Sequence, residues 1–103
     1  MKTYEGRREG HVVLVTANGR SLHPRLDLRN HSPTGFEWGY GGSGPAQLAL
    51  ALLADHLNDE VRALQLYQSF KRSVVAGLPD QSWTLTSQEM DQALEKLEEL
   101  EVL

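Results

Sequence analysis

The stretch that decides the fold runs from residue 36 to residue 54, and reads FEWGYGGSGP followed directly by AQLALALLA. Glycines beside Trp38 and Tyr40 indicate a backbone that turns sharply or approaches another group closely. Pro45 stands where a helix begins, because its fixed φ and missing N–H suit the first helical turn. The alanines and leucines that follow surround the helix axis instead of forming a stripe. They predict a helix over residues 45–56 at the centre of the core.

Three segments of the first third predict β-strands: residues 2–8, 11–17 and 20–28. The second is rich in β-branched side chains and apolar on both faces, which is typical of a central strand. Asn18-Gly19 predicts a type I′ hairpin turn, because both residues tolerate a positive φ. Pro24 cannot donate a hydrogen bond, so it places the third segment at a sheet edge or breaks it in two. We expect a three-stranded antiparallel meander.

The last part of the chain predicts two more helices. Asn58 or Asp59 can cap a helix that continues through residue 76, and residues 83–85 can add a short strand. Thr86 and Glu89 have the spacing of a capping box, in which the two side chains bond each other's free amides at a helix start. The helix that follows has one apolar face, made by Met90, Ala93, Leu94, Leu97 and Leu100.

The predicted fold class is therefore α+β: a small antiparallel β-meander packed against three helices, with a buried Ala/Leu-rich central helix. A chain of 103 residues has the length of a single domain. Within residues 1–103 we assign 1–29 to the meander, 30–44 to a connector and glycine-rich loop, and 45–103 to the helical part.

Composition excludes several classes of protein. The chain has no cysteine, hence no disulfide framework and no cysteine-ligated metal. Its first residues lack the apolar core of a signal peptide, and its longest apolar run is shorter than a membrane span. We expect a soluble cytoplasmic protein with no membrane contact.

Charge is distributed unevenly along the chain. Residues 1–35 carry six Lys and Arg against three Asp and Glu, whereas residues 36–103 carry four against eleven. The overall acidity, a formal net charge of −4, argues against nucleic acid as a partner. The simplest explanation is that the two halves attract each other within one fold.

Four blocks carry a resemblance: YEGR (4–7), GRSL (19–22), SPTGFEWGYGGSGPAQLA (32–49) and YQSFK (67–71). Together they resemble a family of small uncharacterised proteins, a domain of unknown function found in bacteria, archaea, phages and other mobile elements. The likeness spans most of the chain. It implies a shared fold and an intracellular setting, and it supplies no reaction.

The glycine-rich loop offers one binding hypothesis. Its letters fit G-x-G-x-x-G, but no strong strand precedes it and no βαβ unit surrounds it, so we reject a dinucleotide site. A phosphate or carboxylate could still bind the free amides at the start of the helix, where the helix dipole favours an anion. The candidate ligand-binding residues are Arg29, Glu37, Trp38, Tyr40, Gly42, Ser43, Gly44 and Gln47.

A purely structural explanation competes with this hypothesis. Ser43 or Gly44 can be the N-cap, and Gln47 can reach back to the cap amide, which would consume the free donors. Trp38 then fills the core under the helix. Glu37 points the other way, exposed or paired with an arginine, and its charge would repel an anion unless Arg25, Arg29 or His31 lies near.

The sequence gives little support for catalysis, so we predict no catalytic residues, no metal and no cofactor. We favour a protein that is not an enzyme. Pro45 stands where a nucleophile elbow around Ser43 needs glycine. Asp55 and His56 are adjacent on a helix and point about 100° apart. The four histidines show no spacing of metal ligands.

The terminal helix suggests a different role. Its acidic residues face only Lys96, its last turn is acidic where the dipole prefers cations, and it ends on apolar residues. It is either a solvated face or a helix that binds an unknown protein partner or a second copy of the chain. Our leading hypothesis is a non-enzymatic interaction module of a microbial or mobile-element accessory kind. The alternative is a binder, or enzyme, of a small phosphate or nucleotide anion.

Overall fold

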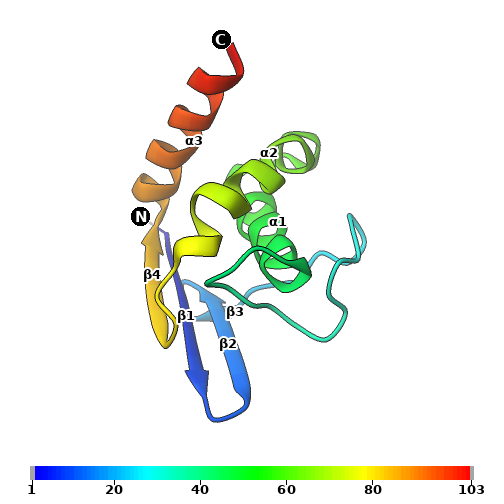
Figure 1. Cartoon of the computed structure of the whole chain (residues 1–103), viewed down its shortest axis with the longest axis vertical. Coiled ribbons are helices and arrows are strands. Elements are labelled where there is room, and N and C mark those ends of the chain that lie inside the picture. Colours follow the sequence, from blue (N-terminus) through cyan, green and yellow to red (C-terminus); the bar gives the residue numbers. More distant parts are fainter. Residues whose placement is uncertain (1, 103) are drawn as a thin grey trace.

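Two tight turns fold the first third of the chain into an antiparallel hairpin. The computed structural model describes residues 2–102, with side chains through residue 100 (Figure 1). Strand β1 (Thr3–Glu9) pairs antiparallel with β2 (Val12–Ala17) over nearly its full length. Asn18 and Gly19 follow β2 with φ angles of 49° and 81°. These left-handed conformations confirm the predicted Asn18-Gly19 turn.

The predicted third strand over residues 20–28 is wrong for most of its length. Strand β3 contains only Arg20–Ser21, paired with the end of β2. One more bond follows, in which the Leu22 amide donates to the Val15 carbonyl at 3.0 Å. Pro24 then has no N–H with which to continue the ladder, and Arg25 turns the chain with a φ of 58°. The chain leaves the sheet at this point as a loop.

A strand from the far end of the sequence extends the sheet on its other side. Strand β4 (Ser82–Thr86) runs antiparallel to β1, so the sheet has four strands in the order β3-β2-β1-β4. The short strand expected over residues 83–85 therefore exists, and the three-stranded meander is corrected to a four-stranded sheet.

Helix α1 (Ser43–Leu57) is the predicted central helix and begins two residues earlier than expected. Every side chain from residue 44 to residue 54 is buried, in agreement with an apolar composition on all sides of the axis. The helix ends at Asn58, whose φ of 50° is left-handed and whose amide donates to the Ala54 carbonyl. Asparagine tolerates that conformation better than most residues.

The other two helices begin with the caps that the sequence indicates. Asp59 caps α2 (Glu60–Ser73) by accepting a bond from the Arg62 amide at 3.1 Å. The end of this helix differs from the prediction, because residues 75–77 form a separate 3₁₀ turn, η1 (Val75–Gly77). Helix α3 (Ser87–Val102) opens with the predicted capping box. The Thr86 amide donates to the Glu89 carboxylate at 3.0 Å and the Glu89 amide donates to the Thr86 hydroxyl at 3.1 Å.

The helices cover one face of the sheet, which places the core between them and the strands. Tyr4, Val15 and Trp83 are buried on that face, whereas Glu5 and Thr84 on the opposite face are exposed. Figure 1 shows α1 and α2 beside the sheet and α3 rising away from β4 toward the C-terminal end. The far end of α3 projects beyond the core, and Leu100 there is 69% exposed.

Gly6 in β1 provides a test of the core packing. A Cβ atom at this position would lie 2.3 Å from Cε2 of Trp83, so the indole or the strand must move to admit it. We expect Gly6→Ala to lower the free energy of unfolding by about 1–3 kcal/mol, measured by urea titration. Gly41→Ala is the control, because nothing lies within 4 Å of its Cβ position, and its change should stay below about 0.5 kcal/mol. Equal losses in the two variants would contradict this packing.

Candidate functional site

Trp38 is a core residue, as the structural explanation of the loop expects. Its side chain is 1% exposed, and its indole N–H donates to the carbonyls of Pro79 and Asp80 at 2.9 and 3.0 Å. The ring meets Trp83 edge to face, with centroids 5.6 Å apart. A buried ring with a satisfied N–H and an aromatic neighbour has no free face for stacking a ligand.

Arg8 organises the polar side of the loop, and the sequence analysis missed it. Its guanidinium lies 4.4 Å from the centroid of the Trp38 ring and forms an ion pair of 2.8 Å with Glu37. Its Nε donates to the Asp80 carbonyl at 2.8 Å. The pairing of Glu37 with an arginine was one of two expected outcomes, and Arg8 is that arginine. One signal was available in the sequence. Arg8 lies two residues after Gly6 and four after Tyr4, so all three share the inner face of β1.

Gln47 does not reach back to the helix cap, so that prediction is wrong. Its side chain is fully buried, and its Oε1 accepts bonds from the amides of His31 and Ser32 at 2.8 and 3.2 Å. Its Nε2 donates to the carbonyls of Pro24 and Arg29 at 2.6 and 3.1 Å. A glutamine amide has two acceptor sites and two donors, so all four are used. Gln47 fastens the loop between the sheet and α1 to the helix.

The start of α1 also differs from the prediction. The N-cap is Gly42, not Ser43 or Gly44, and no side chain forms a bond to the cap. Pro45 has no N–H, and the Ala46 amide already donates to the Gly42 carbonyl at 3.0 Å. The amides of Ser43 and Gly44 are therefore the donors left for a ligand. A Cβ on Gly44 would lie 2.6 Å from Cβ of Glu37, so a carboxylate side chain stands beside them.

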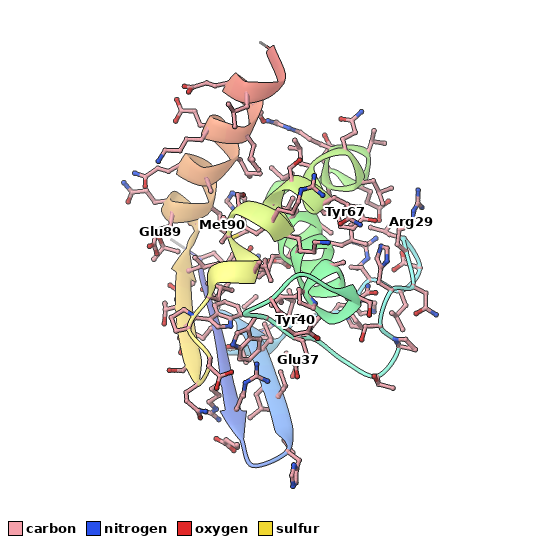
Figure 2. The ribbon with its side chains drawn as sticks, viewed as in Figure 1. Arg29, Glu37, Tyr40, Tyr67, Glu89 and Met90 are labelled. Atoms are coloured by element: carbon pink, nitrogen blue, oxygen red, sulfur yellow. The ribbon has the colours of Figure 1, made fainter. Side chains whose placement is uncertain are left out.

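The predicted ligand-binding residues do not come together as one site. Tyr40 is 52% exposed and packs over Gly42, whose Cβ position lies 2.7 Å from Cε2 of the ring. Arg29 lies apart from Glu37 and Tyr40 (Figure 2) and donates to the neighbouring Leu28 carbonyl at 2.7 Å. The anion site at the start of α1 stays a prediction. Its geometry offers two amides next to an acid and no arginine from the predicted set.

A second candidate site is a groove of about 510 Å³ between α2 and α3. Its floor and walls are mainly apolar, and α3 contributes one side of the helix at three- and four-residue spacing. Figure 2 shows Met90 directed from α3 toward the other helices. The polar side chains in the lining belong to Ser73, Glu89, Gln92 and Lys96, and the remaining lining residues are Phe70, Val74, Leu85, Met90, Ala93, Leu97 and Leu100.

Two of the polar groups in the groove are already engaged within the chain. The Glu89 carboxylate accepts bonds from Thr86 in the capping box. The Ser73 hydroxyl donates to the Ser69 carbonyl at 2.9 Å. These groups are therefore not arranged as a nucleophile with its base. The groove is therefore mainly apolar, and two of its polar side chains have partners within the chain.

Two polar contacts link α3 to the body of the protein, beside its buried apolar face. Nε2 of His56 and the Asp91 carboxylate form a hydrogen bond of 2.6 Å, which joins the end of α1 to the first half of α3. Arg62 of α2 forms an ion pair with Glu98 in the second half. Asp55 faces a different way from His56, as expected for adjacent helical residues. Across residues 2–102, no helix has both the length and the apolarity to cross a membrane. Among the side chains of residues 2–100, no three potential metal ligands gather at one point.

The contact between the last turns of α1 and the start of β1 has clear pKa shifts. Asp55 accepts a bond from the Tyr4 hydroxyl at 2.7 Å and pairs with Lys2 at 2.8 Å. Burial, followed by the bond to Asp55, raises the pKa of Tyr4 well above its ordinary range. Burial also acts to raise the pKa of the Asp55 carboxyl, but the hydrogen bonds from Lys2 and Tyr4 outweigh it and lower that pKa.

Gln47 generates a direct prediction. Gln47→Ala should lower the free energy of unfolding by about 2–4 kcal/mol, because four backbone groups of the loop lose their buried partner. Denaturant unfolding measures the loss. Gln81→Ala is the control, since that exposed amide bonds only to the neighbouring Asp80 side chain, and it should change the free energy by less than about 0.5 kcal/mol. A comparable small effect at Gln47 would contradict the fastening role.

Asp55 generates a prediction about pH. Because its folded-state pKa is lowered, its contribution to stability is present above the unfolded-state pKa, and is lost as pH falls through the folded-state pKa. We expect Asp55→Asn to be less stable than the wild type at pH 7, and to lose less stability between pH 5 and pH 2. Urea unfolding across this range tests both points. Parallel pH profiles for the two proteins would refute the assignment.

The comparisons with known proteins agree with the resemblance of the sequence blocks. No curated protein and no solved structure matches the chain. A family model described as a family of unknown function, DUF6166, matches residues 4–96, from the first inner-face residue of β1 to the middle of α3. The chain therefore belongs to this family of unknown function.

Proposed function

We propose that the protein is a non-enzymatic interaction module, and that it binds a segment of another protein in the groove between α2 and α3. The observation that carries this proposal is the apolar lining of that groove. Val74, Leu85 and Ala93 are only partly buried, and Leu100 at the end of the groove is 69% exposed. An amphipathic helix would cover these side chains, as in other helix-in-groove complexes.

The position of the groove supports this role over catalysis. It is bordered by two helices of ordinary length, so its shape does not depend on a loop. The charged groups in its lining are Glu89 and Lys96, and Glu89 serves the helix cap. Recognition by apolar contact needs no further chemistry. The resemblance stated above supports an accessory role in microbes or mobile elements and a cytoplasmic setting.

A neutral peptide tests the proposal. The probe is an amphipathic 20-residue helix with leucines on one face and glutamines on the other. Titration into labelled protein should shift backbone amide NMR signals of residues 70–74 and 89–100. Ala93→Arg places a charge in the groove and should weaken binding at least tenfold, which corresponds to about 1.4 kcal/mol.

Two further variants make the result decisive. Gln88→Arg adds the same charge on α3 at an exposed residue outside the groove lining, and should bind like the wild type. Leu100→Asp acts at a side chain that is 69% exposed, so it should weaken binding without unfolding the protein. Shifts confined to the open face of the sheet, or unchanged binding by both groove variants, would refute the proposal.

A further inference from the structure

The edge of the sheet at β4 is open. Within residues 2–102, β4 pairs only with β1, and Figure 1 shows it as the outermost strand, with α3 continuing beyond its end. Just before the strand, the Arg8 amide donates to the Gln81 carbonyl at 3.0 Å. Just after it, the Ser87 amide donates to the Lys2 carbonyl at 2.9 Å. These two bonds fix which backbone groups of β4 face β1.

Only two residues of β4 keep free backbone groups. In an antiparallel pair, alternate residues turn their amide and carbonyl toward the neighbouring strand. Because residues 81 and 87 face β1, residues 83 and 85 do so too, and Ser82, Thr84 and Thr86 face outward. Thr86 is already engaged, since its amide donates to Glu89 at 3.0 Å and its carbonyl accepts the first bond of α3. The open edge therefore offers the amides and carbonyls of Ser82 and Thr84, which are both exposed.

The composition of this edge favours pairing with another strand. Residues 82–86 read SWTLT, with no charge and no proline, which are the features that usually protect an edge strand. Tryptophan and threonine also favour extended backbone. The opposite edge differs, because β3 is two residues long and Pro24, three residues after it, cannot continue the ladder. The sheet is thus open to extension at β4.

We propose that the protein forms a dimer in which β4 pairs antiparallel with β4 of a second copy, so that the two sheets become one. A two-fold axis beside Trp83 places Ser82 opposite Thr84 of the second copy, and Thr84 opposite Ser82. Each of these two pairs exchanges two backbone hydrogen bonds, so every free group of the edge finds a partner. The contact is the same on both copies, and it closes at two because each copy has one such edge.

A second copy fits this edge better than a strand of another protein. One contact satisfies the free groups of both chains, whereas a longer strand would gain no more, since the edge ends at the cap of α3. Neither copy brings a charge on β4, although each has a net charge of −4. The hydroxyl side chains of Ser82 and Thr84 form favourable cross-strand pairs. At the two ends, Asp80 comes level with Thr86 of the second copy, and Arg8, 3.6 Å from that carboxylate, offsets its charge.

Concentration tests the inference directly. An interface this small gives a weak dimer. Sedimentation equilibrium from about 10 µM to about 1 mM should therefore show a monomer–dimer equilibrium. Over the same range, NMR should show that solvent exchange of the Ser82 and Thr84 amides slows with concentration, while that of Thr86, held by Glu89, does not change. Salt should strengthen the dimer, because it screens the repulsion between two acidic copies.

Matched variants locate the contact. Thr84→Pro removes the outward amide without breaking the pairing to β1, because that amide points away from β1. Thr84→Lys adds a charge at the edge, and decides the matter if the proline variant does not fold. Both should weaken the dimer at least about tenfold. Thr84→Val keeps the amide, and Val12→Lys places the same charge at a 55% exposed residue of β2, so both should dimerise like the wild type.

A protein that stays monomeric at every concentration would overturn the inference, as would a dimer that keeps its affinity in Thr84→Lys. Slower exchange of the Ser82 and Thr84 amides only when an extended threonine peptide is added would also overturn it, and would assign the edge to another protein. The function of the groove is tested independently. Thr84→Lys should bind the neutral helical peptide like the wild type, so either proposal can fail while the other stands.

Discussion

The burial of α1 on every side is the constraint on which the rest of the structure depends. A helix whose side chains are inaccessible from residue 44 to residue 54 needs cover all round, and a chain of this length has few elements to supply it. The sheet covers one side of α1, and α2 covers another. The loop after β3 has to cover a third, although its backbone cannot pair with a strand. Gln47 solves this problem, because its amide supplies the hydrogen bonds that the loop would otherwise lack.

Features encoded by neighbouring residues could be predicted from the sequence. The Asn18-Gly19 turn, the capping box of Thr86 and Glu89, and the composition of α1 each depend on a few adjacent positions. The α+β class followed from them. The pairing partner of β4, which was not predicted, is a contact that spans the chain. Pairing of β4 with β1 joins residues about eighty positions apart, and nothing in either strand specifies the other.

At the glycine-rich loop, too, local features could be predicted and long-range contacts could not. Its composition correctly indicated close approach of backbone to side chain, since Gly42 packs against Tyr40 and Gly44 against Glu37. It could not show that those approaches are internal. Arg8 comes from β1 and closes the polar side of the loop, although it lies some thirty residues from Glu37 in the sequence. A motif whose letters fit ligand binding can thus also serve the packing of the fold.

The junction between β4 and α3 lies beside the groove and fixes the start of α3. Thr86 is both the last residue of the strand and the residue whose hydroxyl caps the helix, so no linker separates the two elements. β4 is paired in the sheet and the first turn of α3 is held by its cap. No flexible residue therefore lies between the strand and the helix. The start of α3 is thus fixed relative to β4 and the sheet. In the proposed binding role, such a junction would favour a preorganised groove that loses little entropy when a partner binds.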